Sequence, residues 1–226
     1  MKRELVRRLR WWMLDYEYAA RWQLRAALSR DRSDMYLEGT KAPVVIVPGV
    51  YEPWRFMTPL VESIHASGHP VHVLDPLGFN HRPVPEVGAQ VERYLNAHDL
   101  KNVLLVTHSK GGLVGKYVMS GDEAGDRVAA MLAIATPFSG SKYARSMRMR
   151  SLRIFAPDDT TIITLAGQLP VNSRIVSVYS KFDPHIPEGS ALPGARNVEL
   201  PGGRHFRILE RPEVVREFTM MARTYS

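Results

Sequence analysis

Ser109 stands where a short apolar run meets a cluster of glycines, in NVLLVTHSKGGLVGKYVM (102–119). The aliphatic residues before it predict a buried strand, and the residues after it predict a helix. On a sharp turn between the two, the hydroxyl stands clear of the sheet, and the helix N-terminus favours negative charge beside it. Nucleophilic attack is the chemistry that this position suits. Serines near glycines are common, so the stretch alone leaves Ser109 open as an ordinary strand-end residue.

Such a corner needs small residues two positions before and two positions after the serine, because the strand and helix backbones nearly touch there. Gly111 meets the second requirement, and Gly112 and Gly115 allow the helix to pack closely. Thr107 meets the first requirement only in part. Only the backbone N–H of Lys110 is needed for chemistry, so its side chain either forms a salt bridge or meets solvent, or else steers an anionic head group.

Buried strands alternate with helices along the rest of the chain. Strands are predicted at 43–49, 71–76, 102–108, 127–137, 174–180 and 196–201, and helices at 57–67, 86–98, 111–119 and 206–223. Apolar strands separated by helices predict an α/β protein with a doubly wound, mostly parallel sheet and helices on both faces. Residues 141–169 interrupt the alternation and mix basic with apolar side chains, so we expect a small cap insertion there.

The segment THSKGG (107–112) resembles the G-x-S-x-G nucleophile elbow of the α/β-hydrolase superfamily, in particular of its bacterial lipase and esterase branch. The loop ATPFSGS (135–141) is similar to the Thr-Pro loop that follows the next strand in those enzymes. YSKFDPHIPEGSALPGARNVELPGGRHFRIL (179–209) resembles their acid-to-histidine segment. The resemblance covers roughly residues 43–210 and lacks the first two strands of the superfamily, which implies a minimal α/β-hydrolase fold.

The resemblance also implies a Ser-His-Asp triad. Asp183 follows the strand after the cap and His205 follows the last strand, which is the order of acid and histidine in this superfamily. Ser109 would attack an ester carbonyl, His205 would accept the proton of its hydroxyl, and Asp183 would orient and stabilise the imidazolium.

An oxyanion hole requires two N–H donors, each worth about 3 kcal/mol in the barrier. The backbone N–H of Lys110 is expected to be one of them. The other is expected in VPGVYEPW (47–54), where Gly49 matches the glycine of the lipase His-Gly-X turn; Val50 is the first choice and Tyr51 the second. The side chains expected to bind substrate are Tyr51, His108, Phe138 and His185.

Other residues of the same types have simpler interpretations. Asp158 and Asp159 suit a helix N-cap, and Asp75 would act only in a rearranged triad. The remaining histidines are expected to be structural: His65, His69, His72, His81 and His98. The chain has no cysteine and no HExxH or CxxC spacing, so we expect neither a metal ion nor a cofactor.

Positive charge is concentrated at the start of the chain, where residues 1–32 hold nine basic and four acidic residues of a protein with net charge +7. Residues 3–28 predict one helix with two apolar ridges. The ridges are Leu5, Leu9, Trp12, Tyr16 and Ala20, and Trp11, Leu14, Tyr18 and Trp22. Either this helix simply docks on the domain, or one ridge attaches to an anionic membrane surface or a partner.

We therefore expect two segments, an N-terminal basic helix and linker (1–40) and an α/β-hydrolase domain (41–226). No apolar run reaches the roughly 20 residues that span a bilayer, and the basic start lacks the apolar core of a signal peptide. These features favour a cytoplasmic protein, with peripheral membrane contact as the open alternative. No nucleic-acid motif accompanies the basic charge.

The expected function is hydrolysis of a carboxylic ester, small or lipid-like, through an acyl-enzyme. The basic cap and the aromatic helix favour an amphiphilic substrate. One alternative transfers the acyl group to an acceptor other than water. Another is a hydrolase-like scaffold that binds a membrane or partner without turnover, for which Thr107 and Lys110 are the support.

Overall fold

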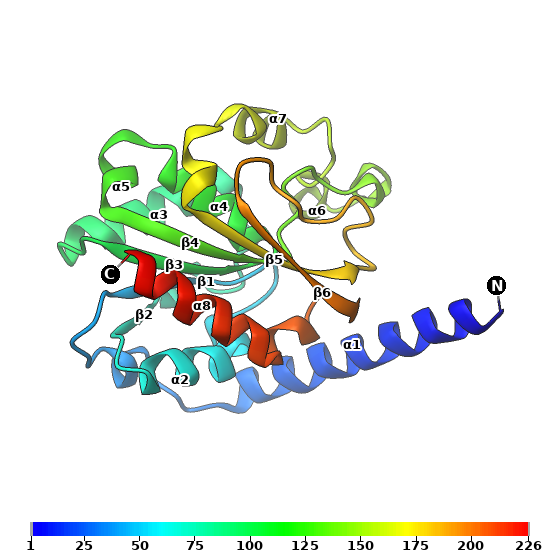
Figure 1. Ribbon diagram of the computed structural model, residues 1–226, viewed down its shortest axis with the longest axis horizontal. Coiled ribbons are helices and arrows are strands. Elements are labelled where there is room, and N and C mark those ends of the chain that lie inside the picture. The colour runs from blue at the N-terminus through cyan, green and yellow to red at the C-terminus, as the bar shows by residue number, and fades with distance from the viewer. Residues whose placement is uncertain (1, 226) are drawn as a thin grey trace.

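A computed structural model describes the backbone of residues 2–225 and the side chains of residues 5–225 (Figure 1). Met1 and Ser226, the outer ends of the two predicted segments, lie outside the described residues. The same is true of the side chains of Lys2, Arg3 and Glu4, which contribute to the predicted basic start.

The predicted apolar runs form six strands that pair in parallel, in the order β2-β1-β3-β4-β5-β6. The strands are β1 (Val44–Val47), β2 (Val71–Val73), β3 (Val103–His108), β4 (Val128–Ile134), β5 (Ile175–Phe182) and β6 (Arg196–Gly203). Every residue of β1, β2 and β3 is buried, because helices cover both faces of the sheet. The doubly wound α/β architecture is confirmed, and within residues 2–225 the sheet is wholly parallel.

The helices lie in two layers against this sheet (Figure 1). They are α1 (Lys2–Leu28), α2 (Thr58–Ala66), α3 (Val84–Ala97), α4 (Lys110–Met119), α5 (Asp122–Arg127), α6 (Arg150–Arg153), α7 (Thr160–Gly167) and α8 (Pro212–Tyr225). Side chains of α1, α2 and α8 share one core cluster, and those of α3, α4, α5 and α7 share the other. Short 3-10 turns lie at Ser33–Tyr36, Trp54–Met57, Asp75–Leu77, Lys142–Ser146, Pro170–Arg174 and Arg207–Glu210.

One predicted strand, 127–137, is longer than the strand that forms. β4 ends at Ile134 because Ala135 adopts a left-handed backbone with φ 48° and Pro137 follows. The last helix likewise begins at Pro212 rather than at residue 206, since a 3-10 turn comes first.

The predicted cap is a helical insertion between β4 and β5. It contains α6 and α7. Ser141 donates its N–H to Phe155 O within the cap, and its hydroxyl ties the start of the cap to the rest of the fold by donating to His185 O. Asp159 caps α7 by accepting from the N–H of Thr161 at 2.9 Å, which confirms its predicted N-cap role. Asp158 forms an ion pair with Arg145 instead.

The two apolar ridges of α1 have different environments. Tyr18, on the second ridge, is buried and packs edge-on against Phe56, while Trp11 lies against Phe182. The first ridge faces outward, with Leu9 51% and Trp12 46% exposed. The N-terminal half of α1 extends past the carboxyl ends of β5 and β6 (Figure 1). The second ridge is therefore the more deeply packed, while Tyr16 of the first ridge still contacts the rings of His185 and Phe206.

Among the described residues, no helix combines the length and the apolar character needed to cross a bilayer.

Candidate active site

Ser109 sits on the sharp turn that the sequence predicts between β3 and α4. Its backbone has φ 49° and ψ −118°, a conformation that a non-glycine residue adopts only when its surroundings enforce it. The enforcing contacts are close: a Cβ on Gly111 would lie 2.1 Å from Val47 O, and one on Gly112 would lie 2.0 Å from Thr136 Oγ1. Both glycines are therefore required by the approach of α4 to the strands.

Thr107 fits the position where a glycine is usual in the elbow. It is fully buried, and its hydroxyl donates to Leu132 O at 3.2 Å. Gly115 provides the space on the opposite side, since the Thr107 methyl group lies 3.3 Å from where a Gly115 Cβ would be. The threonine is thus accommodated without opening the turn.

Both interpretations of the Lys110 side chain are wrong. Its ammonium group is fully buried rather than solvated, and it donates to Asn80 O at 2.7 Å, to Asn80 Oδ1 at 3.0 Å and to Arg82 O. Burial lowers the pKa of Lys110 to about 7, which Glu86 opposes. The side chain holds the loop between β2 and α3 and is not among the side chains that line the cavity in front of Ser109.

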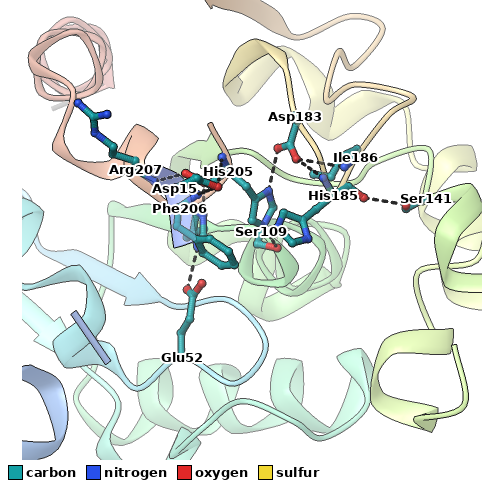
Figure 2. Close-up of polar contacts among 11 residues, drawn as sticks. Asp15, Glu52, Ser109, Ser141, Asp183, His185, Ile186, His205, Phe206 and Arg207 are labelled. Atoms are coloured by element: carbon teal, nitrogen blue, oxygen red, sulfur yellow. Dashed lines mark hydrogen bonds and ion pairs between the residues drawn. The ribbon is translucent and has the colours of Figure 1, made fainter. Parts of the chain in front are cut away.

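The structure brings the three predicted triad residues together at the carboxyl ends of β3, β5 and β6 (Figure 2). His205 Nε2 lies 3.1 Å from Ser109 Oγ, and His205 Nδ1 lies 2.7 Å from Asp183 Oδ2. The other oxygen of Asp183 accepts the N–H groups of His185 at 2.7 Å and Ile186 at 3.1 Å. These bonds fix the carboxylate, which in turn orients the imidazole.

Charges around the imidazole outweigh the effect of burial. Burial by itself would lower the pKa of His205, but the carboxylate of Asp183 and, more weakly, those of Asp15 and Glu52 raise it above its ordinary value. Burial would conversely raise the pKa of Asp183, but His205 and the N–H of His185 lower it. The two shifts agree, since each partner favours the charged form of the other.

His108 is not a substrate-binding residue in this structure, because it lies behind His205 and is fully buried. Its Nε2 donates to His205 O at 2.9 Å, and its Nδ1 lies 2.7 Å from Glu52 Oε2. Glu52 also accepts the N–H of Gly49 at 2.7 Å. The His108–Glu52 pair therefore links the histidine loop to the turn after β1.

Two buried carboxylates are absent from the sequence-based prediction. Glu52 is 2% exposed and Asp15, on α1, is 1% exposed. Asp15 accepts hydrogen bonds from the backbone N–H groups of His205, Phe206 and Arg207 (Figure 2). The sequence does contain a signal for Asp15, because it lies beside the apolar ridge of Trp11 and Tyr18, and an acid on a buried helix face needs hydrogen-bond partners.

The turn after β1 has one N–H free to serve as an oxyanion donor. Gly49 N–H is taken by Glu52, and Tyr51 N–H donates to Phe79 O at 2.6 Å, so the second-choice donor is occupied. Within the described part of the chain, the N–H groups of Val50 and Lys110 donate to no protein acceptor. The two first-choice donors therefore remain available.

A cavity of about 810 Å³ opens in front of Ser109 and His205. The predicted Tyr51 and His185 line it, and burial lowers the pKa of His185 to about 4. Its apolar lining includes Leu9, Trp12, Tyr16, Phe56, Met147 and Phe155. Phe138 does not line the cavity but is buried in the core with the side chains of α4 and α7, which corrects that prediction.

Asp75 is likewise not part of the site. It accepts a hydrogen bond from Trp54 Nε1 at 2.7 Å, which gives it a structural partner away from the cavity. Among residues 2–225, no group of three or more carboxylate or imidazole side chains is arranged to hold a metal ion.

Known structures share this architecture. A monoacylglycerol lipase from Paleococcus ferrophilus superposes with a TM-score of 0.61 at 16% identity, covering 82% of this chain and 97% of the lipase. A Bacillus licheniformis lipase in mature form superposes with a TM-score of 0.61 at 16% identity, covering 80% of this chain and 92% of the lipase. A Bacillus anthracis bromoperoxidase gives 0.61 at 15% identity over 82% and 93%. No protein-family model matches the chain.

These similarities establish the α/β-hydrolase fold for this chain, in a minimal form with a six-stranded parallel sheet and an added N-terminal helix. At identities below 20% they establish the fold alone, so the function has to be argued from the site.

Proposed function

We propose that the protein is a serine hydrolase that cleaves carboxylic esters. The observation that carries the proposal is the continuous hydrogen-bonded chain from Ser109 through His205 to Asp183, placed at three strand ends beside a cavity. A serine hydroxyl is a poor nucleophile until a neutral imidazole accepts its proton, and this chain supplies the base and the acid that orients it.

In the proposed reaction, Ser109 Oγ forms a bond to the ester carbonyl carbon while His205 Nε2 takes the hydroxyl proton. Collapse of the tetrahedral intermediate breaks the bond to the alkoxy oxygen, which leaves as the alcohol with the proton from His205. Water then loses a proton to His205 and attacks the acyl-enzyme, and the carboxylic acid departs as Ser109 regains its proton.

The N–H groups of Val50 and Lys110 are proposed as the oxyanion hole. Lys110 follows Ser109 directly, Val50 lines the same cavity as Ser109, and the donors Gly49 and Tyr51 on either side of Val50 are already engaged. Each donor would lower the barrier by about 3 kcal/mol, because it is oriented before charge develops.

The walls of the cavity favour a substrate with a sizeable apolar group. Aromatic and aliphatic side chains from α1 and from the cap, such as Trp12, Tyr16 and Phe155, face the space in front of Ser109. Similarity to a monoacylglycerol lipase supports the same class of lipid-like ester. The acyl group would lie along these walls, since apolar surface gains about 25 cal/mol per Å² when it leaves water.

Labelling with a fluorophosphonate tests the proposal, because this reagent reacts only with an activated serine. The wild type is expected to be labelled and Ser109→Ala to be unlabelled, with Ser63→Ala as the control that keeps its labelling, since Ser63 is exposed on α2 and does not line the cavity. An unlabelled, folded wild type would contradict the enzyme and favour the non-catalytic scaffold. Hydrolysis of esters of increasing acyl length, with and without alcohol acceptors, then separates hydrolysis from acyl transfer.

We also propose that the mouth of the cavity contacts an anionic membrane surface. Exposed apolar side chains from α1 and the cap surround it, including Leu5 at 60%, Leu9 at 51% and Met147 at 41% exposure. The exposed side chains of Arg10, Arg148 and Arg150 lie on the same two segments. Apolar groups that enter the interface, together with arginines that attract anionic lipids, are the two contributions that peripheral binding requires.

Sedimentation with phosphatidylcholine vesicles, with and without phosphatidylglycerol, tests the membrane contact. Binding is expected to depend on phosphatidylglycerol and to be lost in Leu9→Glu. Leu24→Glu is the control, since Leu24 is 62% exposed on the same helix but does not line the cavity. Equal loss in both variants, or no binding of the wild type, would contradict this part of the proposal.

A further inference from the structure

The loop that carries His205 is bound by a carboxylate from the other end of the chain. Asp15 Oδ2 accepts the N–H of His205 at 2.9 Å, and Asp15 Oδ1 accepts those of Phe206 at 3.1 Å and Arg207 at 2.8 Å. Figure 2 shows these bonds converging on the Asp15 carboxylate behind the ring of His205. Three successive backbone N–H groups thus form an anion-binding concavity that the side chain of Asp15 fills.

The concavity needs an acceptor. His205 and Phe206 lie between the end of β6 and the 3-10 turn Arg207–Glu210, and Arg207 is the first residue of that turn, so the N–H groups of all three have no partner in a strand or helix. Asp15 is 1% exposed, so these N–H groups are shielded from bulk water by the side chain that binds them. Buried backbone donors without a partner are strongly disfavoured, and the carboxylate of Asp15 is the acceptor that the structure provides for all three.

Residue 205 is also held from its other side. His108 Nε2 donates to His205 O at 2.9 Å, and Glu52 fixes the opposite nitrogen of His108. Arg204 N–H donates to Phe182 O at 3.0 Å, so the preceding residue is tied to the end of β5. With its N–H and its carbonyl both bound, the backbone of His205 has little freedom, and its ring is aimed from a fixed point at Ser109.

We propose that Asp15 is a positioning residue for the base of the reaction, so that helix α1 is a working part of the active site and not an appendage. This inference rests on the proposed function, in which His205 must meet Ser109 at hydrogen-bond distance. Asp15 acts through the backbone of residues 205–207 and touches neither the substrate nor Ser109.

A purely structural role for Asp15 makes a different prediction. An acid that merely fastens α1 to the domain would affect the free energy of unfolding, but a folded variant would keep the wild-type labelling rate at a pH where His205 is neutral. A positioning residue would lower that rate, because the backbone of residues 205–207 loses its acceptor. The charged and titratable groups facing His205 are Asp183 after β5, Asp15 on α1, Glu52 after β1, His108 and His185. The negative charge of Asp15 also helps to raise the pKa of His205, so its removal is expected to lower that pKa as well.

The variants are Asp15→Asn, which removes the charge and one acceptor, and Asp15→Glu, which keeps the charge. Glu17→Gln is the matched control, since Glu17 is an exposed acid two positions along the same helix. The rate of fluorophosphonate labelling is measured across pH, with thermal unfolding of the same samples. A displacement of the base by about 1 Å is expected to reduce the rate about 10- to 100-fold.

Asp15→Asn is expected to show that loss of rate together with a shift of the acid limb of the profile to lower pH. Asp15→Glu is expected to keep the wild-type limb and recover part of the rate. Glu17→Gln should match the wild type in both. A folded Asp15→Asn protein with the wild-type rate and the wild-type limb would overturn the proposal.

A second measurement does not depend on turnover. In the full-length protein labelled at histidine nitrogens, NMR titration gives the pKa and the ring tautomer of His205. A lower pKa of His205 in Asp15→Asn, or loss of slow hydrogen exchange at the amides of residues 205–207 in Asp15→Glu if Asp15→Asn does not fold, supports the proposal. Unchanged values overturn it. If the wild type is not labelled at all, the proposed function fails, while this titration still decides the role of Asp15.

Discussion

The corner that carries Ser109 and the loop that carries His205 meet at one hydrogen bond but are held in place differently. The corner is shaped by neighbours on β1, β3 and α4 and by glycines within three residues of the serine. The loop is held by Asp15, 190 positions before His205, and by His108, 97 positions before it. Both are tertiary structures, but the sequence signal for the corner is local, in the glycines after Ser109, whereas the loop has no signal near His205.

This difference indicates where each half is vulnerable. A strained turn fails when an atom is added to it, because the backbones already touch. A loop fixed by distant hydrogen bonds fails when an acceptor or a charge is removed, because its donors then have no partner. The predictions below test this contrast, beginning with the largest expected effect.

Removing the charge next to His205 should cause the largest loss of hydrolysis rate. Asp183→Asn replaces the carboxylate 2.7 Å from Nδ1 with an amide that favours the wrong tautomer, and the hydrolysis rate is expected to fall about 10³- to 10⁴-fold. Thermal unfolding should change much less. Asp158→Asn is the control, since Asp158 is paired at the surface with Arg145. A loss under tenfold would contradict the assigned role of Asp183.

Adding one carbon to the corner should be the next most severe change. The Cβ of Gly111→Ala would lie 2.1 Å from Val47 O, so α4 must move, and we expect a loss of about 3 kcal/mol in the free energy of unfolding and of most serine labelling. Gly167→Ala in α7 meets nothing within 4 Å and is the matched control. Chemical denaturation and labelling measure both effects. Equal stability of the two variants would contradict a contact-limited corner.

Weakening the His108–Glu52 pair, which holds the carbonyl of His205, should have an intermediate effect on the labelling rate. Glu52→Gln removes the negative charge that faces His108 and holds Gly49 N–H, and labelling is expected to slow about tenfold, on the scale of a small displacement of the base. Because Glu52 also raises the pKa of His205, the acid limb should move to lower pH. Glu86→Gln serves as a control that leaves this pair intact. If the acid limb of the pH–rate profile does not move in Glu52→Gln, the effect of Glu52 on the pKa of His205 is contradicted.

The pH dependence of the wild type follows from the raised pKa of His205. The base is inactive when protonated, so the labelling rate should fall as the pH drops through a value above about 6.5, the ordinary value for histidine. The free energy of unfolding should change with the opposite sign. The stabilisation by protonated His205 is fully present below pH about 6.5 and is lost as the pH rises through the raised pKa of His205. Comparing wild type with His205→Gln in denaturation at several pH values checks this sign.

The smallest effect is expected at Thr107. Thr107→Val keeps the shape that Gly115 accommodates and removes only the hydroxyl bond to Leu132 O, so we expect about 1 kcal/mol lower stability and labelling within about threefold of wild type. A large loss of labelling would mean that the hydroxyl, and not the volume, keeps the corner in shape.

Much of the fold follows from local patterns. Continuous aliphatic runs predicted the strands β1 and β3, and the glycines after Ser109 predicted the turn, because periodicity and backbone freedom depend on neighbouring residues. The resemblance to α/β-hydrolases assigned Asp183 and His205 as partners of Ser109, and all three follow strands whose carboxyl ends lie at one edge of a parallel sheet.

Other features depend on contacts between distant segments and had no local signal. Helix α1 has two apolar ridges of similar character, and only packing against Phe56 and Phe182 decides which one is buried. Which way Lys110 points, and whether Tyr51 N–H is already taken by Phe79, depend in the same way on loops that fold back from elsewhere.

The sequence by itself therefore determined the parallel α/β architecture, the corner at Ser109 and the residues that would form its triad, because each rests on local periodicity, turn chemistry or strand order. Only the tertiary structure decided that Asp15 and His108 hold the backbone of His205, and that Phe138 lies away from the cavity. Those outcomes require knowing which side of each helix faces inward, and that choice is made by packing between segments far apart in the chain.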